Sequence, residues 1–212
     1  MMKKIFILLI ALTGIVVCQA QNNAQDILNK TSAAFTKAGG IEAKFRVQLS
    51  QSGKPMGTSA GTIRIKNDKF VMETQEGTTW FNGKTQWSYL SSSEEVNISN
   101  PTQEELQSIN PYLLLNTYKK GYSCKLGTQQ TYAGKQIYEI ILLPTNRNND
   151  ISQITLYIQK QTYQPLYIEI LQKNKSLNKI IVTGYRTKQN YPDKTFNFNK
   201  QKYPNAEEID LR

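Results

Sequence analysis

The 212-residue chain contains no histidine and only two cysteines. Without histidine, catalytic triads that use an imidazole base are excluded, as are zinc sites built from His and several Cys. Any catalysis would have to use carboxylates, Lys or Tyr. Long apolar runs are also lacking, because none reaches the roughly 20 residues that a transmembrane helix needs. These absences favour a binding function, and we do not expect an enzyme, a metal site or a cofactor.

The N-terminus has the pattern of an export signal. Residues 1–4 are basic, residues 5–17 are almost wholly apolar, and Ala20 is the small residue that precedes a cleavage site. We therefore expect residues 1–20 to be a signal peptide cleaved after Ala20. The rest, 21–212, has the length of a single domain.

We expect different fates for the two cysteines, Cys18 and Cys124. A lipoprotein signal has a small residue before its lipidated cysteine, and Val17 before Cys18 does not fit that pattern. Ordinary cleavage, which removes Cys18, is favoured over lipidation. Cys124 then remains alone, so we expect a buried structural thiol and no internal disulfide.

The chain is basic, with a formal net charge of +10. The cations are scattered and form no run longer than two residues. In an exported protein this charge points to anionic lipid surfaces or acidic protein partners and not to nucleic acid. A simple solvated surface is the alternative.

Most of the chain has the period of β-strands. After an amphipathic helix predicted over 23–38, apolar and polar residues alternate in short segments that are separated by turn residues. Asn82-Gly83 is a strong signal for a two-residue hairpin turn. Counting these segments predicts about eleven antiparallel strands, with short pieces at 195–198 and 207–211 at the end.

Two further helices are predicted in mid-chain. Asn100-Pro101 and Asn110-Pro111 each place an N-cap residue before a proline, which suits helices over about 101–108 and 111–119. Eleven strands can form a closed barrel, a sandwich or a curved sheet. The apolar helices favour a mainly β (α+β) fold, a strongly curved, unclosed antiparallel β-barrel with three helices covering its concave hydrophobic face.

Several motifs, in order, resemble the periplasmic outer-membrane lipoprotein carrier family (LolA-like). The hairpin N-G-K-T-Q-W-S-Y at 82–89 resembles that family's D-G-K-x-x-W-x-Y. The similarity covers almost all of the chain after residue 20. The other matching segments are Ile41–Phe45, Ala60–Lys66, Lys69-Phe70, Glu95-Val96, Asn110–Leu115, Leu142–Pro144, Ile154–Ile158, Gln164–Glu169 and Phe196–Phe198.

This resemblance implies an eleven-stranded unclosed barrel that shelters the acyl chains of lipoproteins. It also implies a monomer in the periplasm of a Gram-negative bacterium, carrying acylated lipoproteins from the inner to the outer membrane. An inner-membrane ATP-driven release complex would be the donor, and the outer-membrane acceptor is unidentified.

The strand and helix patterns nominate residues for the acyl-chain site. Their facing depends on strand register, because a slip of one residue moves a whole strand to the other face. The expected cavity residues are Phe45, Val47, Ile63, Ile65, Phe70, Met72, Trp80 and Trp87, and the expected lid residues are Leu28, Phe35, Tyr112, Leu114 and Leu115.

One departure from the family concerns the lid. Family members usually carry Arg-Pro after the strand that matches 60–66, and the Arg holds the helical lid shut. Here Asn67-Asp68 follows instead. The resemblance therefore implies a lid that opens more easily unless Lys66 or Lys69 takes over.

Other classes of function have weaker support. A glycosidase could use Glu94/Glu95 or Glu104/Glu105, but catalytic carboxylates face each other across the bond, and adjacent pairs are usually solvated. A glycan-binding module could use the 12 Tyr and 2 Trp. Within the resembled fold, the alternatives are an outer-membrane lipoprotein acceptor and an envelope lipid- or glycolipid-binding or sensing protein.

Overall fold

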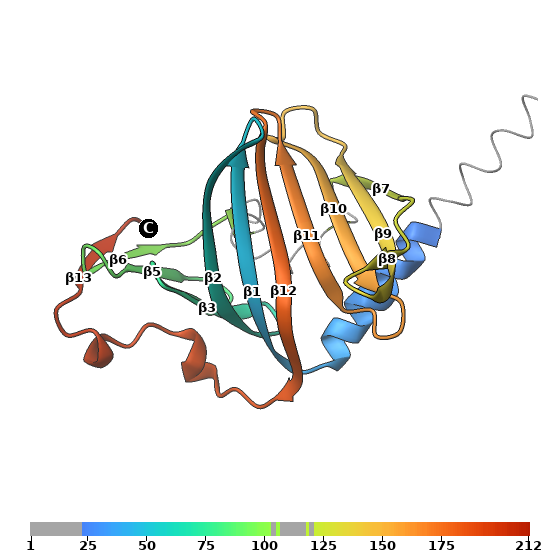
Figure 1. Cartoon of the computed structure of the whole chain (residues 1–212). Helices are drawn as coiled ribbons and strands as arrows, with labels where there is room; N and C mark the ends of the chain where they lie inside the picture. The colour runs from blue at the N-terminus through green and yellow to red at the C-terminus, as the bar shows by residue number, and fades with distance from the viewer. Residues whose placement is uncertain (1–22, 103–104, 107–117, 119–120) are drawn as a thin grey trace, which may run out of the picture.

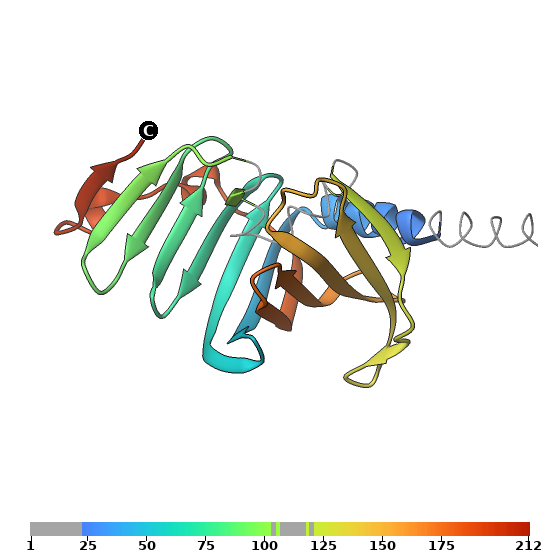
Figure 2. The same cartoon turned by 90° about the horizontal axis from the view of Figure 1, so that it is seen from above.

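One helix and one large sheet make up most of the described chain (Figure 1). This computed structural model describes residues 23–102, 105–106, 118 and 121–212. Seen from above, the sheet is bent, and the N-terminal helix lies along one side of its β9–β12 half (Figure 2).

The N-terminal helix spans residues 23–37, as its apolar spacing predicts. Ala24, Ile27, Leu28 and Phe35 recur every three or four residues and are all buried. The helix ends at residue 37, and two residues later Gly39 adopts the left-handed φ of 69° that favours glycine. The backbone then enters the first strand directly.

The strands form two meanders. Each follows the alternation of apolar and polar residues, and tight turns connect most of its strands. The first meander contains β1 (Gly40–Gln51), β2 (Lys54–Lys66), β3 (Lys69–Thr74), β4 (Gly77–Phe81), β5 (Gln86–Leu90) and β6 (Glu95–Ser99). The second contains β7 (Tyr122–Leu126), β8 (Thr131–Tyr132), β9 (Lys135–Pro144), β10 (Ile151–Gln159), β11 (Pro165–Gln172) and β12 (Ser176–Gln189).

The two meanders join through β1 and β12, which pair antiparallel from Gly40↔Gln189 to Gln51↔Ser176. The strand order is β13-β6-β5-β4-β3-β2-β1-β12-β11-β10-β9-β7, with β8 paired to β9 alone. β13 (Glu207–Asp210) lies parallel to β6, whereas the other pairs are antiparallel. Among the described strands β13 and β7 remain free edges, so the sheet is unclosed. The expected mainly β, unclosed antiparallel architecture is confirmed.

The predicted details need three corrections. The described residues form a 13-stranded sheet and not one of about eleven strands. In this part of the chain one α-helix of several turns is present, and not three. The expected helices over 101–108 and 111–119 lie largely outside the described residues, and of these only residues 105–106 are described as helical. Residues 195–198, expected as a strand, overlap a 3₁₀ helix, η2 (Asp193–Phe196).

After β12 the chain crosses the sheet and returns to the far edge (Figure 1). This C-terminal segment, residues 190–206, contains η2 and a second 3₁₀ helix, η3 (Lys200–Lys202), and leads into β13. Phe196 is fully buried, and the ring of Phe198 lies 5.5 Å from that of Trp80. The segment therefore covers the outer side of β3 and β4.

Candidate functional site

The main apolar cluster lies between the N-terminal helix and the sheet. We call it the helix-face cluster, and the side of the sheet that carries it the helix face. Its buried side chains come from the helix, from β1 to β4 and from β7 and β9 to β11, and from the mid-chain residues Leu106 and Tyr118. Its central members are Leu28, Phe35, Phe45, Ile63, Ile65, Phe70, Phe81, Ile140, Leu142, Ile154, Leu156, Ile158, Ile168 and Ile170.

The structure brings together six of the eight side chains nominated for the cavity. Phe45, Ile63, Ile65 and Phe70 are buried in the helix-face cluster, and Val47 and Met72 pack against it half-buried. The nominated lid residues Leu28 and Phe35 lie in the same cluster. Tyr112, Leu114 and Leu115 lie outside the described residues.

The facing predicted for Trp80 and Trp87 is wrong. In β3 the neighbours Phe70 and Val71 point to opposite faces, and the register pairs Phe70 with Phe81 and Val71 with Trp80. Trp87 is opposite Trp80, so both Trp side chains share the face of Val71.

These Trp residues belong to a second apolar cluster, on the outer face of the sheet. It contains Val71, Trp80 and Phe196, with Trp87, Tyr89, Tyr191, Phe198 and Tyr203 packed around them. On the helix face, Phe81 occupies the position expected for Trp80. The hydrophobic pattern at residues 80–81 does not show which of the two faces the helix, because both residues are large and aromatic.

Most of the buried helix-face cluster was not nominated from the sequence. Ile154, Leu156 and Ile158 on β10 alternate on one face, as do Ile168 and Ile170 on β11. This period-two spacing is a signal that could have identified them. It does not show, however, that these strands face the same helix as Phe45, since that depends on the pairing of β12 with β1.

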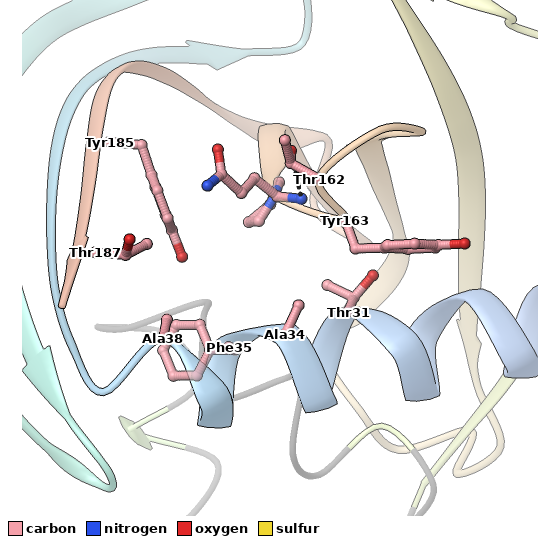
Figure 3. Close-up of a pocket in the computed structure, with 10 residues that line it drawn as sticks. Thr31, Ala34, Phe35, Ala38, Thr162, Tyr163, Tyr185 and Thr187 are labelled. Carbon is pink, nitrogen blue, oxygen red and sulfur yellow. Dashed lines mark hydrogen bonds between the residues drawn. The ribbon is translucent and has the colours of Figure 1, made fainter.

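A small pocket of about 40 Å³ lies under the helix (Figure 3). Thr31, Ala34, Phe35 and Ala38 line it from the helix, and Tyr163, Tyr185 and Thr187 from the sheet, with Thr162, Gln164 and Pro165 completing the wall. Burial raises the pKa of Tyr185. Ligand pockets usually measure about 300–1,000 Å³, so this space accepts a chain only if the helix moves away from the strands.

The end of the helix faces the turn between β2 and β3. A pocket of about 330 Å³ separates Phe35, Thr36 and Gly39 from Asn67 and Asp68. The two lysines considered as substitutes for the family's Arg are used elsewhere.

Both lysines hold the C-terminal segment. The Lys66 Nζ donates to the Tyr191 carbonyl at 2.7 Å, and the Lys69 Nζ lies 2.8 Å from Asp193 Oδ2. The hydrogen bond from Lys69 lowers the pKa of Asp193.

One side chain from mid-chain hydrogen-bonds to the helix. The Tyr118 hydroxyl donates to Asn29 Oδ1 at 2.8 Å, and it lies 3.4 Å from the Gln25 carbonyl. Tyr118 is 2 % exposed, and burial raises its pKa. It therefore connects the chain at residue 118 to the N-terminal helix.

The described carboxylates that were considered for catalysis lie in a helix cap, in a turn and at the start of a strand. Glu105 Oε2 accepts from the Thr102 backbone N–H at 2.7 Å and from its hydroxyl at 2.9 Å, an arrangement that caps a helix start. These bonds lower the pKa of Glu105. Glu94 is exposed in a turn, and Glu95 begins β6. In the described part of the chain no three Cys, Asp or Glu side chains are placed to share a metal ion.

Comparison with known proteins now identifies the family. The pattern of the family described as outer membrane lipoprotein carrier protein LolA matches residues 15–174. The chain belongs to this family. No curated protein sequence matches it. None of the described helices is long and apolar enough to cross a membrane.

Two solved structures share this fold at low sequence identity, and a third match is weaker. An uncharacterized conserved protein from Thermus thermophilus matches with a TM-score of 0.60 and 13% identity, over 89% of this chain and 99% of that one. A DUF1329 family protein from Desulfovibrio piger matches with 0.53 and 12%, over 84% and 97%. A LolA superfamily protein from Nitrosomonas europaea matches with 0.44 and 12%, over 82% and 97%.

Proposed function

We propose that this protein is a periplasmic carrier that shelters the acyl chains of lipoproteins and shuttles them from the inner to the outer membrane. The observation that carries this proposal is the apolar layer between the N-terminal helix and an unclosed sheet. Leu28 and Phe35 contribute to that layer from the helix, and Phe45, Ile63 and Phe70 from the sheet.

The energetics suit reversible acyl-chain binding. Each exposed CH₂ group costs about 0.8 kcal/mol, so a free acyl chain must be covered in water. The helix covers the same sheet side chains that a bound chain would cover. A chain that replaces the helix therefore exchanges one apolar contact for another, and binding and release both stay accessible.

The helix has polar contacts as well as apolar ones, since the Lys30 Nζ lies 5.9 Å from the centre of the Tyr163 ring. Among the described residues, the Tyr118 hydroxyl bonds to its Asn29 side chain. Lys66 and Lys69, which could have replaced the family's Arg, bind the C-terminal segment instead. In this proposal the lid opens when an apolar chain replaces the contacts between the helix and the sheet, and the apolar chain itself provides the opening force.

The remaining parts of the carrier cycle follow the family. Residues 1–20 direct export and are cleaved after Ala20, and residues 21–212 act as a single, monomeric domain. The cargo is an acylated lipoprotein received from an inner-membrane ATP-driven release complex, with an outer-membrane acceptor still to be found. Tyr112, Leu114 and Leu115 complete the lid, and no cofactor takes part.

A pair of alanines provides a matched test. Ala34 lines the pocket under the helix, and its neighbour Ala33 is exposed. Ala34→Trp fills the space that an acyl chain would enter. We expect it to weaken binding of a synthetic triacylated lipopeptide about tenfold, a loss of about 1.4 kcal/mol. The Ala33→Trp control keeps wild-type affinity.

Binding is measured by displacement of a fluorescent fatty acid from protein that has been stripped of lipid and refolded. Circular dichroism confirms that both variants are folded, and the smaller Ala34→Met replaces Ala34→Trp if the latter is not. Release of newly made lipoproteins from spheroplasts tests the cargo itself. Equal affinities of the two Trp variants would contradict the site. If the protein bound glycolipid but released no lipoproteins, its function would instead be that of an envelope lipid-binding protein.

A further inference from the structure

Three turns gather at one end of the sheet, at the top of Figure 1: β1–β2, β9–β10 and β11–β12. The Ser52 N–H donates to the Lys175 carbonyl at 3.0 Å, and the Lys173 N–H donates to the Asp150 carbonyl at 2.8 Å. The Lys173 ammonium also bonds to the Arg147 carbonyl. These bonds hold the three turns together as one surface, which we call the basic end.

The basic end has an excess of exposed cations. Lys54, Arg147, Lys173 and Lys175 are all exposed there. Asp150 is the only acidic residue in the three turns. Among the described residues, no carboxylate forms an ion pair with any of these four cations. Their charge is therefore available to an anionic partner.

The basic end also projects an apolar side chain. Met56 is 69% exposed at the start of β2, and Leu49, beside it on β1, is 39% exposed. The acidic turn between β3 and β4 lies further back, since Glu76 Oε2 accepts from Ser59. Ser59 is five residues along β2 from Lys54, or about 17 Å at the usual strand rise.

We propose that the basic end docks on anionic phospholipid, with the cations at the headgroups and Met56 inserted among them. This goes beyond acyl-chain transport, and it does not require that the helix-face cluster bind acyl chains. Cations beside an exposed apolar side chain are the combination that binds an anionic membrane surface. An acidic protein is a weaker fit, because protein interfaces are enriched in aromatic residues and poor in Lys, whereas these turns contain no aromatic residue.

The test compares two triple variants that change the net charge equally. Lys54→Glu/Arg147→Glu/Lys175→Glu alters the basic end. Lys84→Glu/Lys135→Glu/Lys188→Glu is the matched control, because its three exposed lysines lie in or beside turns, or near the end of β12, at the opposite end of the sheet. Binding is measured by co-sedimentation with vesicles of phosphatidylglycerol and phosphatidylcholine, and with phosphatidylcholine alone.

We expect wild-type protein to bind the anionic vesicles and to dissociate as salt screens the charges. Each cation removed should weaken binding about fivefold, so the first triple variant loses sedimentation and the control retains most of it. Met56→Ser weakens binding several-fold and leaves the salt dependence intact.

Equal losses in the two triple variants would overturn the proposal, since net charge alone would then explain binding. It would also be overturned if wild-type protein binds no vesicles and instead binds an acidic protein through this end. Vesicle binding uses lipid-stripped protein without cargo, so failure of the carrier function in the lipopeptide assay is a separate result.

Discussion

Gly61 on β2 lies opposite Phe45 on β1, where the backbone has no room for a side chain. A Cβ at this position would lie 2.3 Å from the Glu73 carbonyl oxygen and 2.8 Å from Phe45 Cζ. The aromatic ring covers the glycine and packs into the helix-face cluster. The small residue is thus needed for the facing of Phe45.

We predict that Gly61→Ala lowers the free energy of unfolding by about 1–3 kcal/mol, because the neighbouring strand and ring must shift. Gly57→Ala on the same strand is the control, since nothing lies within 4 Å of its Cβ. The control should be neutral or slightly stabilising. Urea unfolding measures both, and an equal effect at the two sites would contradict the packing argument.

At the scale of the element, the C-terminal segment is held by burial more than by ion pairs. Within the segment Phe196 is fully buried, whereas the side chain of Asp193, which pairs with Lys66 and Lys69, is 66% exposed. Exposed ion pairs contribute little, because water and salt screen them. The aromatic contacts of the buried Trp80 with Phe198 and Tyr203 do not depend on charge and are not screened by salt.

We predict that Phe196→Ala costs about 3–5 kcal/mol of stability, whereas Asp193→Asn costs about 0–1 kcal/mol. Phe196→Ala should also release the rings around Trp80 and shift the Trp fluorescence of the folded protein to longer wavelength. Thermal unfolding and emission spectra measure these effects. A larger loss from Asp193→Asn would show that the ion pairs hold the segment.

At the scale of the whole molecule, one carboxylate links the middle of the sheet. Glu42 on β1 is 8% exposed. It lies 3.2 Å from Arg64 Nε on β2 and accepts from Arg186 on β12. Arg64 also contacts Glu73 on β3 at 2.8 Å. The pKa of Glu42 is lowered, first by its hydrogen bond to Arg186.

This depressed pKa predicts a pH-dependent contribution to stability. The contribution is fully present above pH 4.5, the ordinary pKa of Glu, and is lost as the pH falls through the lower pKa of the folded state. We expect Glu42→Gln to cost about 1–3 kcal/mol at neutral pH. The difference from wild type shrinks in acid. Urea unfolding at several pH values measures it, and a difference independent of pH would contradict the ion-pair account.

The described strands show what local patterns can predict. The hairpin at Asn82-Gly83, the helix that ends before Gly39 and the alternation in β9 to β12 follow from backbone preferences and hydrophobic period, which act over a few residues. The resemblance to the carrier family also depends on short motifs in a fixed order. These features determined the class of fold and the family from the sequence by itself.

Only the tertiary structure decided the facing and the long-range pairing. Trp80 faces outward and Phe81 inward because β4 pairs in one register with β3, although the pattern of adjacent aromatic residues fits both. β13 joins β6 as a parallel strand although its sequence, E-E-I-D, is short and charged. The β13–β6 and β1–β12 pairings connect segments more than a hundred residues apart, where partner geometry and burial outweigh local preference.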